Sequence, residues 1–168
     1  MTRESTVVAG LLAGVLALTA IDGRSGAPDT IARGKYLVEV AANCGECHSP
    51  ITATGEPDPR FHLAGHIAGS PIPSPTAFKA LQGEGIAYAR NLTPDVETGL
   101  GAWAFEDFRR VLKEGISKGG RPLNPYMPWQ RYRRFLSDPD IEAVWVYLRS
   151  LSAVRNKVPE SVPFTGPP

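Results

Sequence analysis

The feature that most constrains this chain is the stretch Cys44-Gly45-Glu46-Cys47-His48, which holds the only two cysteines of the sequence. Two thiols at this spacing, followed directly by a histidine, form the pattern through which haem is attached covalently to a polypeptide. Each thiol can add to one vinyl group of the porphyrin, and the adjacent imidazole then faces the iron. We therefore expect Cys44 and Cys47 to carry one haem c and His48 to be an axial ligand of its iron.

Two other uses of a cysteine pair fit this sequence less well. A thioredoxin-like redox pair leaves His48 without a role, and no βαβ pattern surrounds the motif. A zinc site needs further cysteine or histidine ligands at suitable spacing. His62 and His66 are available, but they follow in a loop rich in proline and glycine and make a poor match with the two sulfurs.

Length and composition indicate one domain that relies on a cofactor for part of its core. The chain has 168 residues, of which 42% are hydrophobic, and its 17 glycines and 16 prolines predict much loop structure. A haem would fill interior volume that such a chain lacks. The net charge is only +1, so the sequence indicates no general affinity for nucleic acid.

The N-terminal segment, residues 1–21, has the pattern of an export signal. Val7 to Ile21 is a run of apolar or small residues with one threonine, too short for a comfortable membrane span. It fits the apolar region of a signal peptide, and the alternative is an uncleaved N-terminal anchor. In both cases we expect a periplasmic or other extracytoplasmic domain, in contact with a membrane only if the segment is retained.

Apolar periodicity predicts three main helices in a chain that is otherwise loop. The first covers residues 30–42 and is capped by Asp29, the second covers residues 105–116, and the third begins after the N-cap Ser137. Six prolines predict that residues 49–88 are irregular, with at most one helical turn near residues 78–81. No strand pattern is apparent.

These signals divide the chain into four parts. Residues 1–21 form the signal peptide or anchor, residues 22–28 a polar spacer, and residues 29–155 the haem domain. Residues 156–168 contain four prolines and are expected to form an extended tail.

The sixth ligand of the iron decides what the haem can do. Met127 is the only methionine apart from Met1, and prolines on both sides stiffen its loop. A thioether ligand would favour Fe(II) and raise the reduction potential. His62 and His66 are the alternatives and would give a bis-histidine site.

The sequence resembles the class I c-type cytochromes, especially single-haem domains that serve bacterial dehydrogenases. The resemblance implies an all-α class I cytochrome c fold, with three main helices around one covalent haem and long Pro/Gly-rich loops. It also implies that Gly34 lets the first helix approach the last near Trp145 and Leu148, and that Met127 is the distal ligand. One departure is Ala104, where related sequences often have a capping Ser or Thr. The resemblance is carried by residues 34–37, 44–48, 91–95, 98–103, 126–129 and 137–148.

By the same resemblance, three further residues would lie beside the haem. Asn91 and Thr93 could hydrogen-bond a propionate, and Arg90 could offset its charge. The alternative for Asn91 is an Asx-type turn before Pro94.

Function follows from the iron site. A six-coordinate iron bound by His and Met exchanges electrons, so we expect an electron-transfer protein, not an enzyme, that carries electrons from an exported dehydrogenase towards an oxidase or membrane chain. The alternatives are a ligand-binding or sensor haem protein with an open sixth site, and a haem subunit with a structural role. The segment from Lys118 to Arg134 holds five basic residues and no acidic one, which favours docking to an acidic redox partner.

Overall fold

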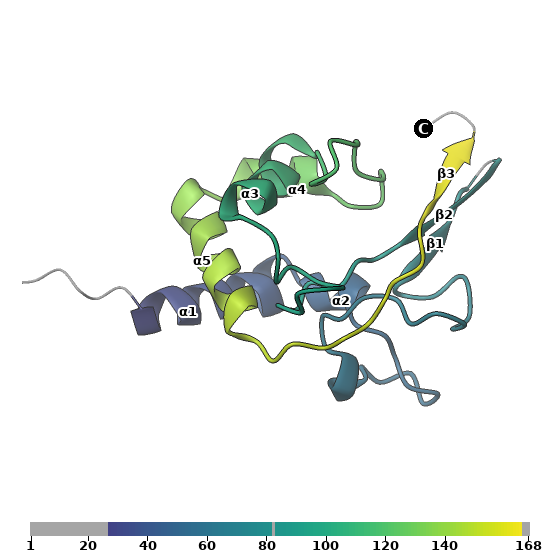
Figure 1. Cartoon of the computed structure of the whole chain (residues 1–168), viewed down its shortest axis with the longest axis horizontal. Helices are drawn as coiled ribbons and strands as arrows, with labels where there is room; N and C mark the ends of the chain where they lie inside the picture. Colours follow the sequence, from purple (N-terminus) through teal and green to yellow (C-terminus); the bar gives the residue numbers. More distant parts are fainter. Residues whose placement is uncertain (1–26, 82, 166–168) are drawn as a thin grey trace, which may run out of the picture.

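The computed structural model describes residues 27–81 and 83–165, in which five α-helices and a three-stranded sheet are connected by long loops (Figure 1). None of the helices in this part has the length and apolarity that a membrane span requires. The predicted signal or anchor segment lies outside these residues. The elements are, in order, α1 (Ala27–Tyr36), the π-helical turn η1 (Leu37–Ala41), α2 (Cys44–His48), the 3₁₀ turn η2 (Pro59–Phe61), β1 (Ala77–Lys79), β2 (Glu84–Tyr88), α3 (Phe105–Glu114), α4 (Trp129–Phe135), α5 (Asp138–Ser150) and β3 (Val162–Thr165).

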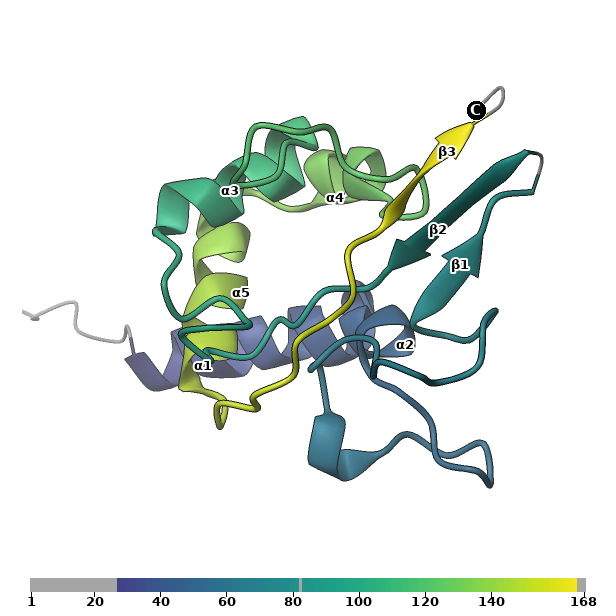
Figure 2. The ribbon, with the colours of Figure 1, turned by 45° about the vertical axis from the view of Figure 1, so that its right-hand side comes forward.

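The first and last helices cross at a glycine, as the sequence predicts. α1 packs more extensively on α5 than on any other element, and the crossing is visible in Figure 2. Gly34 is buried there, and a Cβ atom at this position would overlap Ala143 and Tyr147. The nearest atoms therefore belong to these two residues and not to Trp145 or Leu148, the partners expected from the resemblance.

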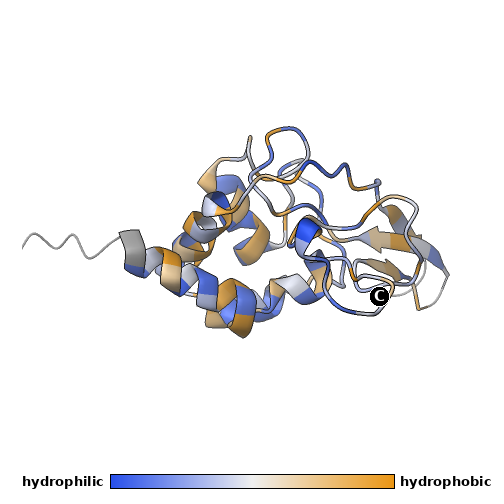
Figure 3. Cartoon of the chain, turned by 90° about the horizontal axis from the view of Figure 1, so that it is seen from below, coloured by the Kyte–Doolittle hydropathy of each residue, from blue (hydrophilic) through white to orange (hydrophobic). Residues whose placement is uncertain are grey.

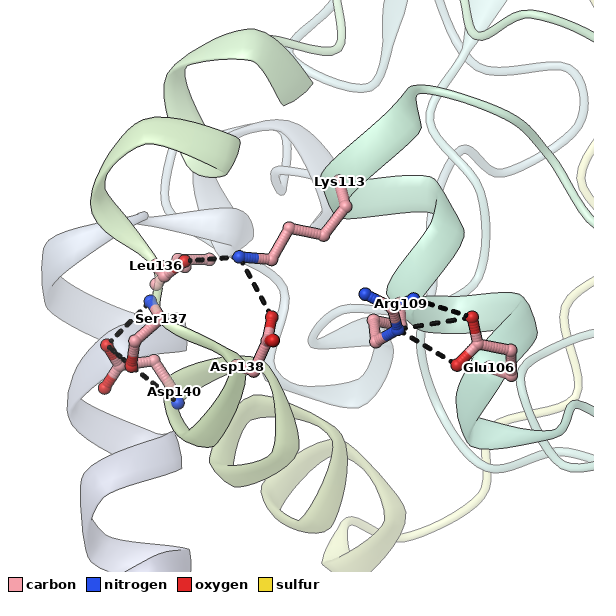
Figure 4. Close-up of polar contacts among 7 residues, drawn as sticks. All are labelled: Glu106, Arg109, Lys113, Leu136, Ser137, Asp138 and Asp140. Carbon is pink, nitrogen blue, oxygen red and sulfur yellow. Dashed lines mark hydrogen bonds and ion pairs between the residues drawn. The ribbon is translucent and has the colours of Figure 1, made fainter.

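α5 begins at the predicted place because Ser137 caps it (Figure 4). The Ser137 hydroxyl accepts a hydrogen bond from the backbone N–H of Asp140, and the Asp140 carboxylate accepts one from the Ser137 N–H at 3.1 Å. This capping box satisfies two N–H groups that the helix leaves unpaired. An ion pair of 2.8 Å joins Arg33 of α1 to Asp140, and another of 3.0 Å joins Lys113 of α3 to Asp138.

The apolar core lies where the helices meet. Buried side chains from η1, α3, α4 and α5 form one cluster, and Figure 3 shows apolar and polar residues alternating around the helices. α3 contributes Phe108 and Leu112, at the predicted spacing. Ala104, which precedes α3, has no capping side chain, but the Asp107 carboxylate accepts a hydrogen bond from its N–H at 3.2 Å. That carboxylate supplies part of the missing cap.

The three-stranded antiparallel sheet is the main difference from the prediction. β1 and β2 form a hairpin within the segment expected to be irregular, and β3 from the expected tail pairs with β2. Figure 2 shows the sheet beside the helices. The expectations of a helical turn at residues 78–81 and of no strands are therefore wrong. The strands are three to five residues long, which is too short for a clear alternating pattern.

The predicted all-α class with three main helices is only partly right. α1, α3 and α5 are the three expected helices, whereas α2, α4 and the sheet were not expected as regular elements. α4 has seven residues and buries only Tyr132. A helix that contributes one buried residue leaves no repeated apolar spacing to recognise.

Candidate haem site

The two cysteines lie on α2, which follows directly from the first helical segment. Asn43, between η1 and α2, has a φ of 48° and turns the backbone left-handed before α2 begins. Cys44 and Cys47 are both free thiols and both half-buried. Cys44 packs against the main apolar cluster. The motif is therefore held at the edge of the core.

The surroundings of the two thiols disfavour a redox pair and a zinc site. Burial raises the pKa of the Cys44 thiol to about 12, and the Glu39 carboxylate acts in the same direction. Burial also raises the pKa of Cys47, with a further effect of Glu46. A redox-active pair needs a thiol whose pKa is lowered. Among residues 27–81 and 83–165, no group of three His, Cys, Asp or Glu side chains could hold a metal ion.

His48, at the end of α2, has a fixed ring orientation. Its Nδ1 lies 2.7 Å from the backbone carbonyl oxygen of Arg90, and because a carbonyl only accepts, Nδ1 carries the proton. Burial lowers the pKa of the imidazole and outweighs the opposite effect of this hydrogen bond, so the ring is neutral at pH 7. Nε2 then presents a lone pair, and the hydrogen bond found for this ring among the described residues is the one at Nδ1. Metal-ligating histidines are oriented in this way.

Met127 lies in the connection between α3 and α4. Its half-buried side chain packs against the same apolar cluster as Cys44. The Met127 N–H donates to the Asn124 carbonyl at 3.0 Å, and the Met127 carbonyl accepts from the Trp129 N–H at 2.8 Å. The backbone is thus held on both sides of the residue that bears the thioether.

Tyr132 connects α4 to the cysteine motif. Its hydroxyl donates to the Ala42 carbonyl at 3.4 Å. Burial and the proximity of Cys44 and Cys47 raise the pKa of Tyr132 to about 12. The segment that carries Met127 and the helix that carries the cysteines therefore meet at the same apolar region.

The two histidines that compete with Met127 have other partners. His62 lies on the outer side of the motif, with Nε2 2.9 Å from the Glu39 carboxylate. His66 is buried, and its Nδ1 lies 2.9 Å from the Thr76 hydroxyl. Burial lowers the pKa of His66. The Glu39 contact occupies Nε2 of His62 and disfavours this ring as an iron ligand, whereas the Thr76 contact of His66 engages only Nδ1.

Asn91 and Thr93 are buried in a network of hydrogen bonds within the protein. The Asn91 amide nitrogen donates to Thr98 Oγ1 at 3.1 Å and to the Val154 carbonyl at 2.8 Å. Its amide oxygen accepts from the N–H and the hydroxyl of Thr93 at 2.9 and 2.8 Å. This is the Asx-type turn that the sequence offered as the alternative. Contact of Asn91 and Thr93 with haem stays a prediction, and each of the Asn91 polar atoms has a partner in the protein.

Arg90 contributes through its backbone, a role that the sequence did not reveal. Its carbonyl orients His48, whereas its guanidinium donates to the Pro159 carbonyl at 2.8 Å and lies 3.3 Å from the Glu160 carboxylate. The side chain thus binds the C-terminal segment, and its predicted effect on a propionate stays untested. A backbone contact leaves no signal in the residue type.

The groups at this site suit a covalently attached haem. Cys44 and Met127 pack against one apolar cluster, and Cys47 and His48 lie on the same short helix as Cys44. The thiols could bond the vinyl groups, the imidazole and the thioether are both known axial ligands of haem iron, and the apolar cluster could line the porphyrin.

Comparison with known proteins places the chain in a family. Residues 31–152 match the family described as Cytochrome c. The chain belongs to the cytochrome c family. Cytochromes c are haem proteins of electron transport, so this cytochrome carries covalent haem c with its iron, and the expectation of an electron-transfer protein and not an enzyme is confirmed. The family also confirms the resemblance on which the fold was predicted.

Relatives of this cytochrome are subunits of dehydrogenases. It is 35% identical to a nicotinate dehydrogenase subunit of Pseudomonas putida over 76% of the chain and 9% of that protein. It is 31% identical to the gluconate 2-dehydrogenase cytochrome c subunit of Pantoea cypripedii, over 83% of the chain and 27% of the relative. It is 33% identical to the cytochrome c subunit of the quinone alcohol dehydrogenase of Gluconobacter oxydans, over 77% of the chain and 24% of the relative. The chain thus spans less than a third of the length of each of them.

Proposed function

We propose that this protein is a single-haem cytochrome c that takes electrons from an exported dehydrogenase and passes them towards a respiratory acceptor. Cys44 and Cys47 would attach the haem, and His48 and Met127 would bind its iron. The bound haem supplies the one-electron couple. The polypeptide orients the ligands, excludes water and presents the group to redox partners.

The observation that carries the proposal is the orientation of His48. The Arg90 carbonyl fixes its protonated nitrogen, which leaves the other nitrogen free to bind iron. Met127 lies against the same apolar cluster as Cys44 and is the only methionine in the described part of the chain. An iron bound by both groups has no vacant site for a substrate. Electron exchange is then the activity that remains.

The cysteine content supports the proposal of a single haem. Each haem c uses a pair of thiols, and the sequence has two cysteines in all. One relative, 31% identical over 73% of this chain, is the diheme cytochrome c-type of Cereibacter sphaeroides. A second haem in the present chain would need a second attachment motif.

The donor is proposed from the relatives and from the haem itself. The gluconate, alcohol and fructose dehydrogenases named among the relatives have cytochrome subunits that match this chain. We propose a dehydrogenase as the electron donor and an oxidase or membrane chain as acceptor. We propose that residues 1–21 direct this protein to the periplasm, as a cleaved signal peptide or a retained anchor. N-terminal sequencing of exported holoprotein separates the two: a start near residues 18–28 means cleavage.

The test of the proposal combines attachment, stoichiometry and ligand binding. Acid–organic extraction of the denatured protein should leave the haem on the polypeptide, and reductive titration should take up one electron per chain. Haem that enters the organic phase would overturn covalent attachment. Cys44→Ala or Cys47→Ala should lower the yield of holoprotein, while Thr54→Ala in an exposed turn serves as a matched control.

Binding of carbon monoxide distinguishes the proposed electron carrier from the second candidate function, a ligand-binding or sensor haem protein. A ligand-binding or sensor protein would bind it rapidly and stoichiometrically in the ferrous state, because its sixth position would be open or easily vacated. The present proposal expects slow or negligible binding by the wild-type protein. Rapid stoichiometric binding would therefore favour the sensor function over electron transfer.

A further inference from the structure

Tyr126, the residue before the proposed iron ligand Met127, is held by the sheet. Its hydroxyl donates to the backbone carbonyl of Lys79 in β1 at 2.8 Å. Its ring stacks on Phe78, with centroids 5.1 Å apart and planes at 22°. The ring of Phe164 in β3 meets it edge-on, with centroids 5.6 Å apart and planes at 81°. Tyr126 therefore contacts the first and the third strand of the sheet at once.

The strands that form this contact come from two distant parts of the chain. β1 and β2 are a hairpin in the segment after the haem motif, and β3 is the last described element. β2 pairs with both, in the order β1-β2-β3. Gly85 lies so close to Phe164 that a Cβ atom there would overlap the ring. Phe164 is thus fixed against the sheet, and its position in turn limits the movement of Tyr126.

The contact matters because it ties the Met127 loop to the sheet. The loop is also held by hydrogen bonds to Asn124 and, through the Leu123 N–H, to the Gly115 carbonyl after α3, and the Met127 side chain packs against the apolar cluster. Tyr126 adds to these supports a connection to β1 and β3. A thioether is a neutral and weakly bound iron ligand, so its residence on iron depends on how firmly the loop is held.

We propose that Tyr126 is a positioning residue for the distal ligand, and that Phe78 and Phe164 form with it an aromatic clamp that keeps the Met127 sulfur on the iron. The clamp closes only when β3 has paired with β2. The C-terminal strand therefore controls how often the sixth position opens, although it lies outside the three-helix framework that carries the haem. The inference rests on the proposed ligation by Met127.

Ligand exchange on the ferric holoprotein measures this opening directly. At saturating imidazole, the rate of binding is limited by dissociation of the methionine. We expect Tyr126→Ala to raise this limiting rate tenfold or more, and to weaken the sulfur-to-iron charge-transfer band of the ferric spectrum. Phe164→Ala, which leaves the loop sequence intact, should raise the rate severalfold. Tyr126→Phe keeps both ring contacts and removes one hydrogen bond, so its effect should be smaller than that of Tyr126→Ala.

Two controls separate positioning from general destabilisation. Tyr36→Ala removes an exposed tyrosine of α1 and should leave the limiting rate unchanged. Gly34→Ala loosens the crossing of α1 and α5, and should lower the denaturation midpoint without a comparable rise in the rate. Limiting rates that follow the midpoint across all variants would overturn the clamp in favour of a structural role for the aromatic residues.

The outcomes also distinguish failure of the clamp from failure of the proposed ligand. Wild-type protein that lacks the charge-transfer band and binds imidazole without a limiting rate would show that Met127 does not bind the iron. A wild-type protein with the band, together with Tyr126→Ala and Phe164→Ala proteins whose rates equal that of wild type, would overturn the clamp alone. If Tyr126→Ala fails to mature, Phe164→Ala and Tyr126→Phe decide the question by the same measurement.

Discussion

Met127 is the residue on which the proposed redox chemistry depends most. Met127→Ala should open the sixth position, admit carbon monoxide to the ferrous iron and abolish the sulfur-to-iron band. The reduction potential should fall by a sizeable part of the ~0.8 V range over which axial ligands act, because the preference of the thioether for Fe(II) is lost. Met127→His should restore six ligands and still lower the potential. Spectroelectrochemistry of the two variants measures both effects.

His62→Ala and His66→Ala are the matched controls for that experiment. If Met127 is the sixth ligand, neither substitution should open the sixth position, because the two imidazoles contact Glu39 and Thr76 instead of the iron. Carbon monoxide binding by either variant, with the Met127→Ala spectrum unchanged from wild type, would establish a bis-histidine site instead.

For single residues, the sequence predicted the side chains with distinctive chemistry, but it did not predict the contacts that the backbone makes with them. The sequence has only two cysteines, three histidines and two methionines, so the candidate haem-binding residues Cys44, Cys47, His48 and Met127 could be recognised. The spacing of the cysteine motif and the prolines on both sides of Met127 also helped. The Arg90 carbonyl, which orients His48, could not be recognised, since every residue has a carbonyl. Its position depends on a loop that meets α2 only in the folded protein.

Among the contacts between helices, the crossing of α1 and α5 should be especially sensitive to the addition of a single side-chain atom. Gly34→Ala places a Cβ atom against the backbone of Ala143. This backbone is part of α5, so it cannot give way unless the whole helix shifts. We expect a loss of about 2 kcal/mol or more in the free energy of unfolding, measured by denaturant titration of the ferric holoprotein. Gly119→Ala is the control, because no atom lies within 4 Å of its new Cβ. Equal stability of the two variants would contradict close packing at Gly34.

The start of α5 should make stability depend on pH. Burial opposes ionisation of Asp140, but hydrogen bonds from Ser137 and Arg33 outweigh it, and the pKa is lowered from 3.8. A carboxyl with a lowered folded pKa stabilises the protein above its unfolded pKa and loses that effect as the pH falls through the folded value. Asp140→Asn should thus cost about 1 kcal/mol at pH 7, and the cost should shrink progressively as the pH falls below 3.8. Urea titrations at pH 7 and across a series of acidic pH values test this, and a cost that does not shrink in acid would contradict it.

The sequence predicted the helices whose signals lie within one segment of the chain. It did not predict the strands, which form only when segments far apart in the sequence pair with each other. α5 follows from Ser137, Asp140 and an apolar stripe that all lie within one segment. β3 has no such cause: Glu84 and Thr165, which it brings together, are 81 residues apart. The proline-rich sequence on either side of it indicates extended backbone, but not the partner with which that backbone pairs.

The ion pairs of the folded molecule reduce the number of basic residues that are available in the predicted docking region. Of the five basic residues between Lys118 and Arg134, Lys118 pairs with Asp107 at 3.8 Å and Arg121 with Glu160 at 3.9 Å. The three arginines of α4 have no ion pair among the described residues, and two of them border a surface hollow with Ala41 and the half-exposed Phe135. Within residues 118–134, the basic side chains without an ion pair therefore all lie on α4, which follows Met127 and contacts the segment before the cysteine motif through Tyr132. That helix is where an acidic partner should dock.

Charge reversal on α4 tests this docking region. Arg131→Glu with Arg133→Glu should lower the second-order rate of electron transfer with an acidic redox partner roughly tenfold or more at low salt, because steering acts on the encounter rate. The difference should shrink as salt rises, since exposed charges are screened over about 8–10 Å at ordinary ionic strength. The spectrum and potential should stay nearly unchanged. Stopped-flow kinetics across a salt series gives the rate.

The matched control carries the same change of net charge on another segment. Arg155→Glu with Lys157→Glu alters two exposed residues that precede β3, away from α4 in the sequence. If docking uses α4, this pair should change the rate much less than the α4 pair does. Equal effects would show that only the net charge matters, because a long-range field does not depend on which face bears the charge. A rate that ignores both reversals and the salt would show an apolar contact, for which Phe135→Ser on the same helix is then the informative change.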